Sequence, residues 1–180
     1  PDAGKGAGEK IPNELRKEYA ELSKIKGWRR MLSNFYESPF KLEGYTWNTV
    51  EHYYQASKFK MGNKEFYASF SLDAAESNAN ISKDPKMAKI AGGKTGKQGK
   101  EFIRPKTIKV DADFFNTNRH RLEMLRAQKS KFTQNKELSE MLLKTKNARL
   151  MHYIRGKPAE EFTGLMKIRK ILAQRYTKSL

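Results

Sequence analysis

Residues 49–59 read Thr-Val-Glu-His-Tyr-Tyr-Gln-Ala-Ser-Lys-Phe (TVEHYYQASKF), and this stretch decides the fold. Its aromatic and apolar residues recur at spacings of three and four, which predicts a helix from about Thr49 to Met61. Glu51, Gln55 and Lys58 share the opposite stripe of that helix. Asn48 is the expected N-cap, and Glu51 three residues later makes a variant of the capping box. A carboxylate in the first turn of a helix is favoured in its ionised form.

A β-hairpin is predicted just before this helix, from Pro39 to Trp47. Its apolar residues alternate with polar ones, as expected for two short strands with one buried face. The Glu43-Gly44 pair is the expected turn, because glycine accepts a positive φ.

Helices are predicted for most of the remaining chain, so the expected fold class is mostly α. A helix beginning at Pro85, with Asp84 as its cap, is expected to end at Gly92-Gly93. Lys94–Lys100 lacks apolar residues and is expected to be a flexible loop. The other predicted helices span Ile11–Lys26, Lys64–Leu72, Asp111–Phe132, Glu137–Leu143, Asn147–Tyr153 and Pro158–Tyr176. The expected division is a flexible tail at 1–10, a helical N-terminal extension at 11–27 and one domain at 28–180.

The composition points to a polyanionic partner. Lys and Arg number 37 against 20 Asp and Glu, a net charge of +17, whereas solubility alone needs only ~2–8. A phosphate polymer screens such a surplus best, because binding releases condensed counterions. The absence of cysteine excludes disulfides, cysteine-ligated zinc and cysteine nucleophiles. No secretory or membrane-spanning apolar run is present, so an intracellular place (cytoplasm or nucleus) or a virion interior is expected.

Basic residues concentrate in two stretches, 83–109 and 119–157. Lys94, Lys97 and Lys100 recur every third residue beside Gly96 and Gly99, a pattern that can lay ammonium groups along phosphates. A solvated loop that binds nothing specific remains the alternative. No base-reading motif is recognised, so salt-dependent, sequence-independent binding is expected. DNA is the preferred nucleic acid, and RNA is the alternative that the sequence leaves open. The predicted nucleic-acid-binding residues are Lys94, Lys97, Lys100, Arg104, Lys106, Arg119 and Arg121.

The 49–59 stretch, the segment Leu32–Tyr36 (LSNFY) and the hairpin between them resemble the NADAR (YbiA-like) family. The family pattern is a Ser-Asn-Phe stretch, a Pro-containing hairpin and then T-x-E-H-Y-F-Q-x-x-K-F. Weaker matches extend the resemblance over roughly Trp28 to Leu172. It implies a compact, single-domain, mostly helical fold with a small β-hairpin and a pocket for a ribosyl group. It also implies N-glycosidase activity without a cofactor, on a phosphorylated riboflavin intermediate or on ADP-ribose linked to nucleic acid.

The resemblance assigns the candidate site residues. Glu51 matches the catalytic glutamate, which would stabilise the positive charge that develops at the anomeric carbon; a helix cap is its alternative role. Asn34 would hold sugar hydroxyls and Phe35 would stack on a base, or they are a turn residue and a core residue. His52 would assist, or is a packed neutral ring. The implied substrate-binding set is Ser33, Asn34, Phe35, His52 and Gln55. Three scattered histidines make a metal site improbable.

The sequence departs from active relatives in two places. Phe114-Phe115-Asn116 stands where they carry a Trp, and 153–162 lacks their D-x-x-W-G segment. Half of the presumed catalytic pair therefore has no visible counterpart in this sequence. Losing one acid–base group typically lowers the rate of an enzyme by ~10²–10⁴. The favoured interpretation is therefore a nucleic-acid-binding protein with weak or lost glycosidase activity. The alternatives are an active N-glycosidase recruited to ADP-ribosylated nucleic acid, and a scaffold that meets an acidic protein.

Overall fold

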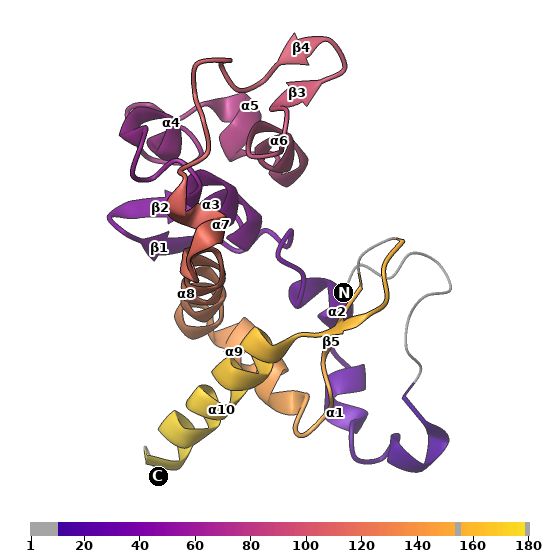
Figure 1. The fold of residues 1–180 in the computed structure, drawn as a ribbon. Helices are drawn as coiled ribbons and strands as arrows, with labels where there is room; N and C mark the ends of the chain where they lie inside the picture. The colour runs from indigo at the N-terminus through magenta and orange to yellow at the C-terminus, as the bar shows by residue number, and fades with distance from the viewer. Residues whose placement is uncertain (1–10, 154–155, 179–180) are drawn as a thin grey trace. The chain divides into compact units, whose positions relative to one another are not determined.

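The computed structural model describes residues 11–153 and 156–178, and the chain is mostly helical with three short strand pairs (Figure 1). It divides into two units, each described by itself: unit 1 comprises 1–36 and 132–180, and unit 2 comprises 37–131. Unit 2 contains β1 (Phe40–Leu42), β2 (Tyr45–Trp47), α3 (Val50–Ser57), α4 (Lys64–Ala68), α5 (Ala79–Ser82), α6 (Pro85–Ala91), β3 (Lys97–Gln98), β4 (Glu101–Phe102), α7 (Asp113–Asn116) and most of α8 (Arg119–Gln134). Unit 1 contains a 3₁₀ turn η1 (Asn13–Leu15), α1 (Ala20–Ser23), α2 (Trp28–Met31), α9 (Lys136–Lys144), β5 (Met151–His152), β6 (Glu160–Glu161) and α10 (Thr163–Lys178).

The predicted hairpin is confirmed. Strands β1 and β2 pair antiparallel, with Phe40 opposite Trp47 and Leu42 opposite Tyr45. Both turn residues have positive φ, 55° at Glu43 and 81° at Gly44, which matches the twist of a two-residue hairpin.

Helix α3 forms the centre of the unit 2 core. Val50, Tyr53 and Ala56 are fully buried, and the Trp47 ring meets the Tyr53 ring edge-on at 5.2 Å. The expected N-cap is wrong by one residue: the Thr49 hydroxyl, not Asn48, accepts the backbone N–H of His52. The helix also ends earlier than expected, at Ser57, and turns follow it.

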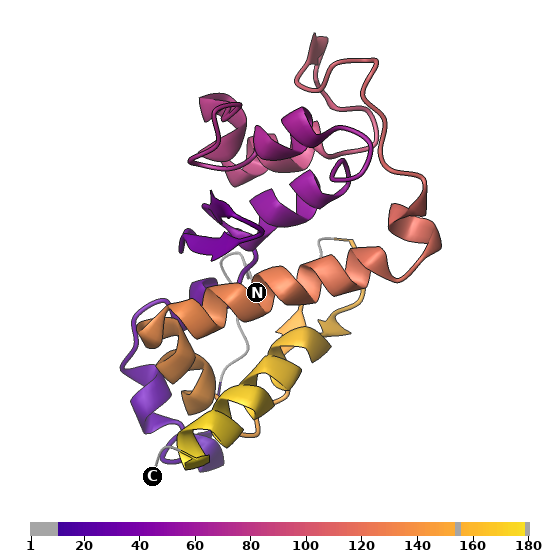
Figure 2. The same ribbon diagram turned by 90° about the vertical axis from the view of Figure 1, so that its left-hand side faces the viewer.

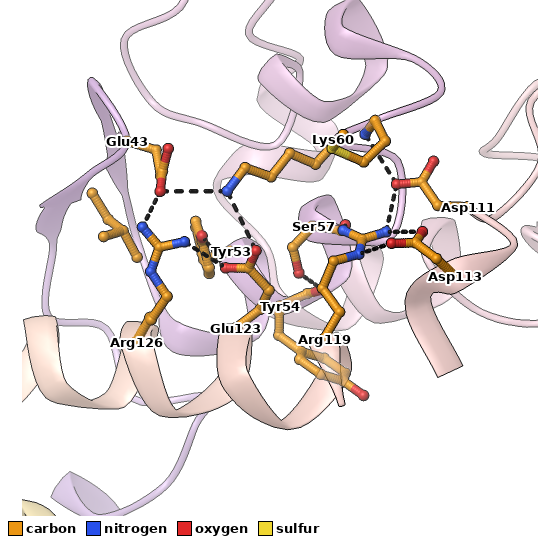
Figure 3. Close-up of polar contacts among 12 residues, drawn as sticks. Glu43, Tyr53, Tyr54, Ser57, Lys60, Asp111, Asp113, Arg119, Glu123 and Arg126 are labelled. Atoms are coloured by element: carbon orange, nitrogen blue, oxygen red, sulfur yellow. Dashed lines mark hydrogen bonds and ion pairs between the residues drawn. The ribbon is translucent and has the colours of Figure 1, made fainter. Parts of the chain in front are cut away.

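Helix α8 is held to the rest of unit 2 by ion pairs (Figure 3). Lys60 bridges Glu43 and Glu123 at 3.4 and 3.3 Å, and Arg126 pairs with the same two carboxylates. The single predicted helix over 111–132 is instead two, because the backbone is extended at Thr117 (φ −115°, ψ −178°). That break separates α7 from α8.

Helix α6 follows the prediction closely. The Asp84 side chain caps its start by accepting the N–H of Lys86, and Gly92 follows its last residue. The loop expected at 94–100 instead starts a small hairpin, in which Lys97 lies opposite Phe102. Gly96 and Gly99 have φ of 65° and 60°, which lets this short segment turn.

Unit 1 departs more from the sequence prediction. The helix expected over 11–26 is only η1 and α1, because Tyr19 and Leu22 alone are buried there and an unpacked short helix is marginal in water. The helix expected at 147–153 is wrong: β5 pairs there with β6. The final helix starts at Thr163 and buries Leu165, Ile168 and Leu172. The side chain of Tyr176 and the expected tail at 1–10 lie outside the described residues, and the predicted domain limits stay a prediction.

Candidate functional site

Glu51 is a buried acid in the first turn of α3. The residue is 6% exposed, and its only hydrogen-bond partner among the described residues is Gln55, whose Nε2 donates to Glu51 Oε1 at 2.7 Å. Burial raises the pKa of Glu51, against the opposing effects of the Gln55 hydrogen bond and the positive charges of Lys89 and Lys58. Desolvation therefore outweighs the first-turn position, which by itself favours the ionised form.

Lys58 places a second buried charge near Glu51. Its Nζ donates to the carbonyl of Gly92 at 2.8 Å, and burial lowers its pKa to about 8, an effect that Glu51 opposes. The same Nζ lies 5.5 Å from the ring centroid of Tyr54 and 5.6 Å from that of Phe115. Phe115 is 56% exposed, so an accessible aromatic ring borders this group of charges.

Gln55 is packed against Gly92 at the end of α6. A Cβ at residue 92 would lie 2.1 Å from Gln55 Oε1 and 2.8 Å from its Cβ, so only glycine fits there. Gln55 Oε1 is buried and has no hydrogen-bond partner in the described part of the chain. Buried acceptors are usually satisfied, so this oxygen is an exception inside the site.

His52 is packed inside the fold, and both of its ring nitrogens are hydrogen-bonded. Its ring is fully buried, and its two nitrogens lie 2.8 Å from the Thr49 hydroxyl and 2.9 Å from the carbonyl of Ile81. A carbonyl only accepts, so Nε2 carries a proton, and in the neutral ring Nδ1 accepts from the Thr49 hydroxyl. Burial lowers its pKa to about 4. The packed neutral ring is therefore what the structure shows, and neither nitrogen is left for substrate.

The other implied substrate residues belong to unit 1. Ser33, Asn34 and Phe35 are half-buried and follow α2. The Ser33 hydroxyl accepts the backbone N–H of Phe35 at 3.1 Å, which makes a local turn. The structure brings Glu51 and Gln55 together on α3, and the roles of these three residues stay a prediction.

Two of the predicted nucleic-acid-binding arginines are engaged inside the fold, and their role in binding stays a prediction. Arg104 is 7% exposed and donates to the carbonyls of residues 91, 93 and 94, at 2.7, 2.8 and 3.2 Å. Arg119 pairs with Asp111 at 2.7 Å and Asp113 at 2.9 Å, and donates to the carbonyl of Ser57 (Figure 3). The sequence shows that these residues are charged, but it does not show the carbonyls and carboxylates that bind their guanidinium groups in the fold.

The remaining predicted basic residues are exposed. None forms an ion pair with a described acidic residue; they are Lys94, Lys97, Lys100, Lys106 and Arg121. Four of them lie between 94 and 106, around strands β3 and β4. Their charge is therefore unneutralised by the protein and open to an anionic ligand.

The NADAR domain family matches residues 23–156, which include the whole Glu51 site. The chain belongs to the NADAR family. The NMR structure of the E. coli protein YbiA is similar in fold, with a TM-score of 0.58 over 82% of this chain and 80% of that one, at 24% identity. No curated protein compared with the chain matches it.

Two further observations concern metal binding and membranes. Across 11–153 and 156–178, no three His, Asp or Glu side chains gather in a way that could bind a metal ion. Of the helices described, none is long and apolar enough to cross a membrane.

The predicted site omits Lys58 and Gly92. The sequence placed Lys58 on the same stripe as Glu51 and Gln55, seven residues or two helical turns after Glu51, but the prediction gave it no role in the site. No local pattern links Gly92 to Gln55, because that contact joins residues 37 apart in the chain.

Proposed function

We propose that this NADAR protein is an N-glycosidase that uses Glu51 to cleave the bond between a ribosyl carbon and a base nitrogen. The observation that carries the proposal is a buried, raised-pKa carboxyl group with one hydrogen bond and no ion pair, beside a buried lysine. Buried ionisable groups of this kind cost stability and concentrate at functional sites. This reverses the preference drawn from sequence, since Arg104 and Arg119 no longer support an extended basic surface.

A raised pKa lets Glu51 serve in both halves of the reaction. As the C1′–N bond breaks, its electron pair goes to the base nitrogen, which takes the Glu51 proton. The carboxylate formed then stabilises the positive charge that develops on the ribosyl carbon. Water adds to that carbon and returns a proton to Glu51. In this scheme one residue supplies both the acid and the counter-charge, so the reaction needs no second acidic residue from the 153–162 segment.

The test is turnover of ADP-ribosylated DNA and of a phosphorylated ribosylaminopyrimidine. Glu51→Gln should lower the rate by ~10²–10⁴, the usual cost of removing one acid–base group. Glu65→Gln is the matched control, because Glu65 is exposed and forms no ion pair with a described residue. No turnover by the unaltered protein, or equal turnover by Glu51→Gln, would refute the proposal.

A second function, nucleic-acid binding, is favoured by the exposed lysines between 94 and 106. Binding through phosphates should weaken steeply with salt and ignore base sequence. A gel shift across a salt series tests it, with Lys94, Lys97 and Lys100 changed together to Glu. Unchanged affinity in that variant would remove this segment from the interface. If the chain binds but turns nothing over, the interpretation favoured by sequence, binding with a lost glycosidase, stands instead.

A further inference from the structure

The hairpin of β3 and β4 carries an exposed aromatic ring between lysines. Phe102 is 37% exposed, although most phenylalanines of unit 2 are buried. Lys97 lies opposite it in the hairpin, with Nζ 4.2 Å from the ring centroid. Lys106, further along the chain, places its Nζ 4.6 Å from the same centroid. A ring with two ammonium groups beside it combines an apolar face with a dense positive charge.

The hairpin is a defined platform rather than a loose loop. At its base, Arg104 binds the carbonyls of residues 91, 93 and 94, and the carbonyl of Gly96 accepts the N–H groups of Ile103 and Arg104. Ile103 packs against the core of unit 2. The strands themselves project beyond α5 and α6 in both views of unit 2 (Figures 1 and 2). The base is therefore held while the tip stays accessible.

We infer that this hairpin binds single-stranded nucleic acid, with a base stacked on Phe102 and the flanking phosphates on Lys97 and Lys106. The inference rests on the second proposed function, nucleic-acid binding, and names the form of nucleic acid that it takes. Every base offers a π-face, and only an unpaired strand leaves that face open. An exposed cation–π contact is weaker than base stacking, so a phosphate can draw each ammonium group off the ring as a base takes its place.

The positive charge around the Phe102 ring favours binding of a polyanion. Lys94, Lys100 and Lys109 are exposed nearby in sequence and have no described acidic partner. Glu101 is the one acidic residue between 94 and 109. A duplex would meet the same lysines through its phosphates but could not use the ring. The expected signature is therefore a preference for a single strand over a duplex that depends on Phe102.

The experiment compares fluorescence anisotropy of a labelled single-stranded oligonucleotide and its duplex, across a salt series. Phe102→Ala should weaken single-strand binding roughly 5- to 150-fold, the range of one lost stacked base, and leave duplex binding unchanged. Lys97→Gln with Lys106→Gln should lower the slope of log affinity against log salt by about 0.7 for each lysine. Leu122→Ala, another exposed apolar residue of unit 2, and Lys26→Gln with Lys64→Gln are the matched controls.

Phe102→Trp separates stacking from loss of the hairpin fold. It should keep single-strand affinity, and its emission should be quenched when the oligonucleotide binds. Equal binding of both strand forms, with no effect of Phe102→Ala, would overturn the inference while leaving phosphate binding intact. No binding to either form would refute both. Displacement by polyglutamate as effective as by oligonucleotide would assign the surface to an acidic protein and also overturn it.

Discussion

Replacing Gly92 by Ala tests the packing that supports Glu51. The new Cβ would lie 2.1 Å from Gln55 Oε1 and 2.8 Å from Gln55 Cβ. Rotation of the Gln55 amide relieves the first contact but not the second, because Cβ is fixed by the backbone of α3. Overpacking of this kind costs ~1–3 kcal/mol. At φ −82° the backbone accepts alanine, so the lower entropy of the unfolded chain returns ~0.4–1 kcal/mol.

We expect Gly92→Ala to lower the free energy of unfolding by roughly 1.3 kcal/mol in urea titrations, the difference between the middles of those two ranges, ~2 and ~0.7 kcal/mol. The Gln55→Ala background removes everything beyond Cβ and should recover part of that loss, which a double-mutant cycle measures. Turnover should fall with Gly92→Ala as well, since Gln55 is displaced from Glu51. A variant as stable as the original protein, or an equal loss in both backgrounds, would refute this account of the site.

Three further changes follow from the same geometry. Because burial raises the pKa of Glu51, the folded chain holds the Glu51 proton more tightly than the unfolded chain does. The resulting contribution to the free energy of unfolding is full below about pH 4.5 and is lost as pH rises through the folded pKa. Glu51→Gln should remove this decline from unfolding free energies measured between about pH 4 and 8. Because burial lowers the pKa of Lys58 to about 8, the unfolded chain binds the extra proton between pH 8 and 10.5, and stability should rise over that window in the original protein but not in Lys58→Met. Arg104→Ala should lower the free energy of unfolding by ~2–4 kcal/mol, since one buried and two partly buried carbonyls lose a charged donor. Lys106→Gln should change it by less than ~0.5 kcal/mol, and equal effects of the two substitutions in calorimetry would contradict the structural role of Arg104.

Local patterns predicted the elements whose causes are local. The β1–β2 hairpin follows from alternation and a Glu43-Gly44 turn, and α6 follows from the Asp84 cap and the glycines after it. Elements that depend on distant packing were predicted less well. The 11–26 stretch has helical spacing but buries only Tyr19 and Leu22. Within 147–153, residues 151–152 pair as a strand with residues 160–161.

By itself, the sequence determined the family, the mostly helical class and the position of Glu51 in the first turn of α3. These depend on residue order within a few turns of chain, which short-range spacing records. Only the tertiary structure decided the protonation tendency of Glu51, the close approach of Gln55 to Gly92 and which cations remain exposed. Each of these depends on desolvation or on a partner far along the chain, as the carbonyls around Arg104 and the carboxylates beside Arg119 illustrate. A charge becomes available to a ligand only when the fold leaves it unpaired.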